Sequence, residues 1–138
     1  MVTKRIITST ECDCREEIKL GVGRGWHPLL DDLIYDIQQV LKKTPKRRLE
    51  VHQVKEKFGG LRFYVGYEYN GDNTPPLEED LWQVIRQYED RSYSTCEVCG
   101  ESGKPTKSGW IKVFCEGHSQ MVKDGKSPWG DLQQKDGP

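Results

Sequence analysis

The sequence lacks the features that mark membrane and secreted proteins. No segment approaches the roughly 18 consecutive apolar residues that a membrane-spanning helix needs. The N-terminal residues, MVTKRIITST, contain no apolar stretch of the kind found in signal peptides. We therefore expect a soluble protein of the reducing cytosol, where cysteines are more often metal ligands than disulfide partners. An odd cysteine count of five also argues against a closed disulfide framework.

The sequence also lacks the motifs that would indicate catalysis. It contains no G-x-x-x-x-G-K-[ST] phosphate loop, no H-E-x-x-H motif and no nucleophile–base signature. The hypothesis from this absence is that the protein is not an enzyme.

A strong net charge is missing too, but the charges are unevenly distributed. The net charge is −1, so no global field draws the chain to nucleic acid. Residues 42–62 nevertheless contain eight basic side chains against two acidic ones, and residues 68–90 contain seven acidic against one basic. These segments could dock on a charged partner or neutralise each other within the fold.

The clearest motif that is present lies in residues 96–118, CEVCGESGKPTKSGWIKVFCEGH. Its spacing is C-x2-C, fifteen residues, then C-x2-H, which selects Cys96, Cys99, Cys115 and His118. Three thiolates and one imidazole make a closed tetrahedral set, which favours a structural Zn²⁺ over a catalytic metal with an open position. A cysteine cluster without metal is the alternative, and Cys12 and Cys14 could form a second site. Trp110 and Phe114 are expected to cover the metal unit or dock it on the main domain.

Periodicity predicts an α+β fold. Apolar residues from Leu29 to Leu41 recur at helical spacing after Pro28, and a second helix is expected from residues 74–76 to about 90–92. Alternation predicts strands at 48–54 and 61–67, with a short one at 5–8. The expected architecture is a small antiparallel hairpin packed with two helices, plus a C-terminal treble-clef or zinc-ribbon-like unit. The expected divisions are an irregular segment 1–24, a core 25–93, a zinc-binding unit 94–119 and a mobile tail 120–138.

The segment VKEKFGGLRFYV (54–65) could be a phosphate loop or a hairpin turn. Residues after Gly59-Gly60 have strand propensity and do not open a helix, so the hairpin is favoured. Basic and aromatic side chains flank the turn and could contact nucleic acid, grip an acidic protein surface, or pair with acids of the same chain. The candidate binding residues are Lys55, Lys57, Arg62 and Tyr64.

Three motifs in this order, GWHPLLDDL (25–33), VKEKFGGLRFYV (54–65) and CEVCG…GW…C-x2-H (96–118), make the chain resemble a family of small proteins of tailed phages, prophages and bacteria. The resemblance covers residues 25–118. It implies a phage or mobile-element context and the host cytoplasm as the compartment, but no activity.

Three functional hypotheses follow. The first is a zinc-stabilised, non-enzymatic accessory protein that binds and modulates a host protein, for example as an inhibitor of an antiviral defence system such as a CRISPR effector. The second is a nucleic-acid-binding zinc module that uses the basic hairpin. The third, a metal-dependent nuclease, would need an open position on the metal.

Overall fold

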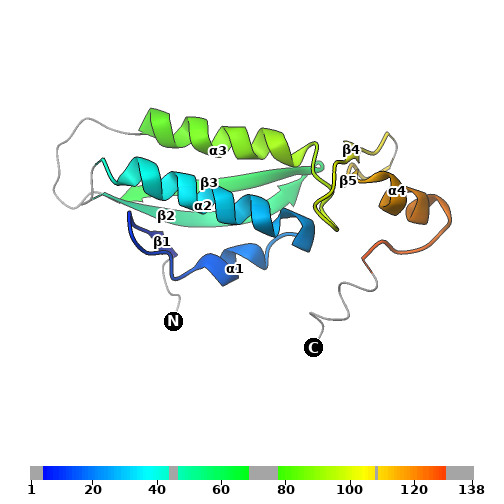
Figure 1. The fold of residues 1–138 in the computed structure, drawn as a ribbon, viewed down its shortest axis with the longest axis horizontal. Coiled ribbons are helices and arrows are strands. Elements are labelled where there is room, and N and C mark those ends of the chain that lie inside the picture. The colour runs from blue at the N-terminus through cyan, green and yellow to red at the C-terminus, as the bar shows by residue number, and fades with distance from the viewer. Residues whose placement is uncertain (1–4, 44–46, 69–77, 108, 130–138) are drawn as a thin grey trace.

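A computed structural model of the 138-residue chain describes residues 5–43, 47–68, 78–107 and 109–129. The fold is α+β, as predicted: a three-stranded antiparallel sheet in the order β1-β2-β3 packs against helices, and a second small unit follows it (Figure 1). The elements in chain order are β1 (Ile6–Ile7), α1 (Arg15–Lys19), a 3₁₀ turn η1 (Arg24–Trp26), α2 (His27–Leu41), β2 (Arg48–Lys57), β3 (Gly60–Glu68), α3 (Glu78–Ser92), β4 (Lys104–Pro105), β5 (Val113–Phe114) and α4 (Glu116–Lys123).

The predicted strand at 5–8, the hairpin and both long helices are confirmed, whereas α1 and α4 were not expected. The predicted opening of the second helix at 74–76 lies outside the described residues. Helix α4 runs to Lys123, so residues 120–123 of the expected tail are helical, and residues 130–138 of it are not described.

The hairpin is longer and its turn tighter than the sequence suggested. Lys57 pairs with Gly60, which leaves Phe58 and Gly59 as a two-residue turn. Their φ angles are 53° and 87°, and positive φ at both central positions is the pattern of a type I′ turn, whose twist matches that of the strands. Glycine adopts this conformation freely, but phenylalanine does so only at a cost.

One face of the sheet carries the core. Helix α2 has an apolar face because its buried residues recur three or four positions apart, and this face packs with apolar residues of β2, β3 and α3. The largest fully buried side chains include Trp26, Leu33, Ile37, Leu49 and Leu61.

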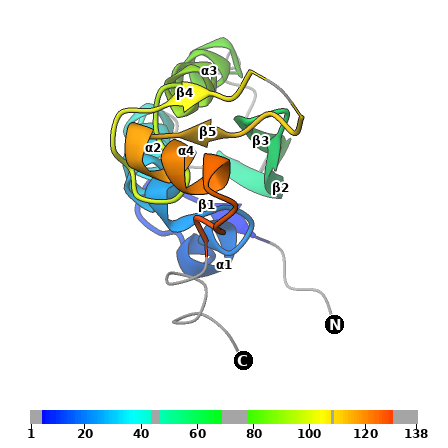
Figure 2. The ribbon, with the colours of Figure 1, turned by 90° about the vertical axis from the view of Figure 1, so that its right-hand side faces the viewer.

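Side chains of α3 close the outer edge of β3. The backbone N–H of Leu61 donates to Ser92 Oγ at 2.9 Å, and that of Phe63 donates to Glu89 Oε2 at 2.9 Å. Figure 2 shows the helices gathered on one side of the hairpin, so its opposite face is left uncovered by the described elements.

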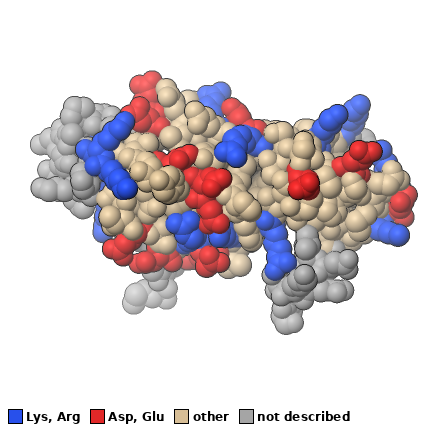
Figure 3. Space-filling model, in the orientation of Figure 1, with Lys and Arg blue, Asp and Glu red and all other residues tan. Residues whose placement is uncertain are grey.

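Acidic and basic side chains alternate over the face that carries α2 and α3, as Figure 3 shows for the described residues. Among the described residues, an exposed ion pair of 3.9 Å between Lys43 and Asp80 joins the two oppositely charged segments of the sequence. Such an exposed pair contributes little to stability.

The C-terminal unit differs from expectation in one respect. Of residues 110–114, only Val113–Phe114 form a strand, β5, which pairs with β4. Phe114 is buried, but Trp110 is 89% exposed. The expectation that Trp110 covers or docks the metal unit is therefore wrong; its ring faces solvent because strand β5 begins only at Val113.

Candidate metal centre

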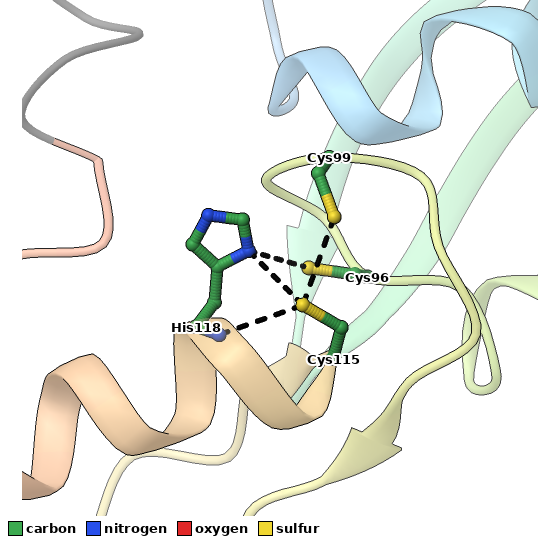
Figure 4. Close-up of side chains that lie close together, drawn as sticks. All are labelled: Cys96, Cys99, Cys115 and His118. Atoms are coloured by element: carbon green, nitrogen blue, oxygen red, sulfur yellow. Dashed lines mark hydrogen bonds between the residues drawn. The ribbon is translucent and has the colours of Figure 1, made fainter.

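The structure brings the four predicted ligands together. The donor atoms of Cys96, Cys99, Cys115 and His118 all lie within 4.8 Å of one another (Figure 4). Cys96 Sγ is 3.6 Å from His118 Nδ1, and Cys99 Sγ is 3.7 Å from Cys115 Sγ. Cys115 Sγ is closer to His118 Nδ1, at 3.1 Å.

These separations fit a tetrahedron around one metal ion. Zn–S and Zn–N bonds of about 2.3 and 2.05 Å imply S···S distances of about 3.8 Å and S···N distances of about 3.6 Å. The Cys96–His118 and Cys99–Cys115 distances agree closely with these values, and the Cys115–His118 separation would lengthen slightly around an ion. The donor set and its geometry can therefore hold a tetrahedral metal.

Two local structures aim the ligands. The first is a knuckle in which the Gly100 N–H donates to the Cys96 carbonyl at 2.8 Å, and Gly100 adopts φ of 86°. The second is the start of α4, where Cys115 is the N-cap and its Sγ accepts a hydrogen bond from the His118 N–H at 3.5 Å. The C-x2-H spacing works because residues N-cap and N3 of a helix lie on the same side of its first turn.

The electrostatics of the cluster favour a cation at its centre. Burial, and then hydrogen bonds shared with Cys96 and Cys115, raise the pKa of the Cys99 thiol to about 11. Burial also acts to raise the pKa of Cys115, but the backbone N–H groups of His118 and Gly117 and the neighbouring thiols outweigh it, so that pKa lies below its usual value. One thiolate thus disfavours ionisation of the next thiol, and a bound metal cation would relieve that repulsion.

The metal knuckle is fixed to the core by the glycine-rich segment 21–25, for which the sequence analysis predicted no regular structure. The Gly25 N–H donates to the Glu97 carbonyl at 2.8 Å, and the Trp26 indole N–H donates to the Thr95 carbonyl at 2.9 Å. A Cβ at Gly25 would lie 2.1 Å from the Cys96 carbonyl oxygen, so only glycine permits this approach. The glycines at every second position, 21, 23 and 25, were the sequence feature that could have indicated this close backbone approach.

The second cysteine pair does not assemble a comparable cluster. Cys12 Sγ and Cys14 Sγ lie 3.6 Å apart, and Cys14 is buried in the core. Burial raises the pKa of both thiols, that of Cys14 to about 12, with the neighbouring thiol adding to the shift there. Within the described residues, the Cys96–His118 set is the one group of three or more potential ligands.

The candidate binding residues of the hairpin lie on its uncovered face. Lys55 pairs with Arg62 across the strands, and Tyr64 follows on the same face. Arg62 donates to the Tyr93 hydroxyl at 3.1 Å, and this bond is the main reason why its pKa is raised. Among the described residues, neither Lys55 nor Lys57 forms an ion pair, and Lys57 instead lies 5.6 Å from the Phe58 ring centroid. Pairing with acids of the same chain was one of the alternatives, but the neighbouring Glu56 binds Lys112 at 2.8 Å.

The fold and site together define a small α+β protein whose C-terminal unit carries a Cys₃His cluster able to hold a metal ion. A scan of protein-family models and searches of curated proteins and solved structures find no match to this chain. Across the described residues, every helix is too short or too polar to cross a membrane.

Proposed function

We propose that the Cys₃His cluster binds one structural Zn²⁺. The small unit around it supports this, because its own apolar cluster consists of Cys96, Val98 and Phe114 with Cys115 and Trp129 at its margin. So little buried surface contributes little folding free energy without a metal. Four protein ligands also fill the tetrahedron, which disfavours the nuclease hypothesis because no position is left for substrate or water.

Elemental analysis tests this proposal. The protein purified without added metal should contain about one zinc per chain, and Cys99→Ser should lose it. Cys12→Ser is the matched control, since that thiol lies outside the cluster, and it should retain the metal. A metal-free wild-type protein whose C-terminal unit is nevertheless fully folded would refute the proposal.

We further propose that the protein is a non-enzymatic binding protein whose partner is another protein. The observation that carries this is an exposed apolar cluster where the hairpin turn meets the loop of the metal unit. We call Phe58, Trp110 and Ile111 the tip patch; they are 66%, 89% and 41% exposed. Ile111 lies against the turn, since a Cβ at Gly59, the residue after Phe58, would lie 2.8 Å from Ile111 Cγ2. Tryptophan and other aromatic side chains are enriched among residues that dominate binding energy.

The backbone of the turn supports the same proposal. Phe58 holds φ of 53° although asparagine or glycine would occupy that position with less strain. Its ring is exposed, so packing within the described structure does not explain why phenylalanine occupies this position. Strained residues of this kind occur at functional sites, where the side chain serves a purpose outside the fold.

The resemblance to phage and prophage proteins directs the choice of partner to a host protein in the host cytoplasm, including antiviral defence complexes such as a CRISPR effector. Affinity capture from host-cell lysate, with wild type and Trp110→Ala side by side, tests the proposal. A specific protein should be recovered with wild type and be depleted with the variant. Equal recovery with both, or recovery of background alone, would count against the tip patch.

Nucleic-acid binding is the second candidate, because Lys55 and Lys57 lie unpaired beside the exposed Tyr64 on the open sheet face. Phosphate contacts by these lysines would make the affinity fall steeply with salt. Charge reversal of Lys55, Lys57 and Arg62 should then abolish binding to single-stranded DNA or RNA. The absence of any complex at low salt would eliminate this candidate.

A further inference from the structure

A groove of about 1090 Å³ is lined by none of the metal-cluster residues and by none of the tip-patch residues. Its walls come from α1, the glycine-rich segment, the end of β2, the metal knuckle and the chain beyond α4. Figures 1 and 2 show α1 and the segment that follows α4 on the same side of the molecule. The lining residues relevant here are Glu17, Gly23, Lys55, Glu97, Lys112 and Trp129.

Glu97 places a carboxylate in this lining with one oxygen unused. The side chain is only 4% exposed, and its Oε2 accepts a hydrogen bond from the Gly23 N–H at 3.1 Å. Its Oε1 is buried and has no hydrogen-bond partner. A buried acceptor without a partner destabilises the fold, and more so if the group is charged, so this oxygen indicates a missing donor.

Trp129 adds an aromatic ring next to the carboxylate. The Trp129 ring and the Glu97 side chain both lie against Gly23, since a Cβ at Gly23 would lie 2.7 Å from Trp129 Cζ3 and 2.9 Å from Glu97 Cγ. The ring is held in place by an edge-to-face contact with Phe114 at 6.2 Å between centroids. A carboxylate beside an aromatic ring is the pairing that recognises organic cations.

Acidic and basic side chains are equal in number in the lining of the groove, but most of the basic ones are engaged. Lys112 is bound to Glu56 at 2.8 Å and Lys19 to Asp31 at 2.9 Å, while Arg24 has interactions of its own. Among the described residues, Glu17 and Glu97 form no ion pair. The groove is also wider than one side chain requires, which suits a segment of a larger molecule.

We propose that this groove binds an arginine side chain presented by a partner protein, with the guanidinium donating to Glu97 Oε1 and stacking on Trp129. A guanidinium suits the pair better than an ammonium, because its planar face stacks on the ring while its edge donates N–H groups. The groove is separate from the tip patch, so this proposal does not depend on the function proposed above.

Titration of the isotope-labelled, metal-loaded protein with Nα-acetyl-arginine amide, followed by NMR, tests the proposal. The indole signal of Trp129, identified by its absence in Trp129→Leu, should shift together with the amide signals of Gly23 and Glu97. The neutral analogue Nα-acetyl-citrulline amide should bind about tenfold more weakly or worse, since it loses a charge-assisted hydrogen bond.

Glu97→Gln is the decisive variant, because it keeps an acceptor for the Gly23 N–H while removing the charge. It should retain zinc and weaken arginine binding about tenfold, as should Trp129→Leu. Trp110→Leu, which alters only the tip patch, should bind arginine like wild type. Equal shifts with citrulline, undiminished binding by Glu97→Gln, or no shift at all would overturn the proposal, and none of these results would bear on capture through Trp110.

Discussion

The indole N–H of Trp26, at the start of α2, donates to the carbonyl oxygen of Thr95, the residue before the first metal ligand, at 2.9 Å. Trp26 is fully buried in the main core, so this bond joins the two units at the point where the metal knuckle begins. The position of the cluster relative to the sheet is consequently set by contacts to the backbone of the metal knuckle.

Gly25→Ala should disturb both units together. Its Cβ would meet the Cys96 carbonyl at 2.1 Å, and rigid backbone atoms cannot yield cheaply. We expect a loss of more than about 2 kcal/mol in unfolding free energy and weaker retention of zinc, measured by urea denaturation and a chelator competition. Gly117→Ala is the control, since nothing described lies within 4 Å of its Cβ, and it should be neutral or slightly stabilising. Equal effects of the two substitutions would contradict the packing.

Removing the metal should loosen one unit before the other. The main core is much larger than the cluster of Cys96, Val98 and Phe114. With a strong chelator, we expect amide hydrogen exchange to accelerate at Gly100 and Gly103 in the metal unit, while Val51 and Ile37 in the core remain protected. Uniform loss of protection would show instead that the whole fold depends on the metal.

Phe58→Asn should stabilise the protein while weakening capture of its partner. Asparagine adopts positive φ more readily than phenylalanine, so the turn should gain about 0.5–1 kcal/mol in thermal or urea unfolding. The exposed ring would be lost from the tip patch. A variant that is more stable and still captures the partner would remove Phe58 from the proposed binding surface, and a less stable variant would show that its ring supports the hairpin.

Tyr88 should give the protein a distinct alkaline response. Burial, and then its hydrogen bond to the Asp36 carboxylate, raise the pKa of Tyr88 to about 12 from an ordinary value of 10.0. The folded state holds this proton more tightly than the unfolded state. The resulting stability is complete below pH 10 and is lost as the pH rises towards 12. In a spectroscopic titration of phenolate absorbance, Tyr88→Phe should remove an ionisation near pH 12, whereas Tyr35→Phe, which alters an exposed ring, should leave that ionisation in place.

The sequence revealed the helix α2, the hairpin and the four metal ligands because each is encoded locally. The apolar period of α2 and the C-x2-C and C-x2-H spacings need no knowledge of distant residues. The groove was not predictable in this way, since Glu97 and Trp129 meet at Gly23 only through the docking of separate segments. The exposure of Trp110 was missed for the same reason: the strand period marked it as inward-facing, but pairing with β4 begins only at Val113.

The hydrogen bonds from Leu61 and Phe63 to α3 affect how other chains can approach. An open strand edge invites pairing with another chain, whether as a recognition mode or as aggregation. Ser92 and Glu89 occupy the donors that an incoming strand would need. Strand addition along this stretch of β3 is therefore blocked, and a partner at this edge would have to contact side chains.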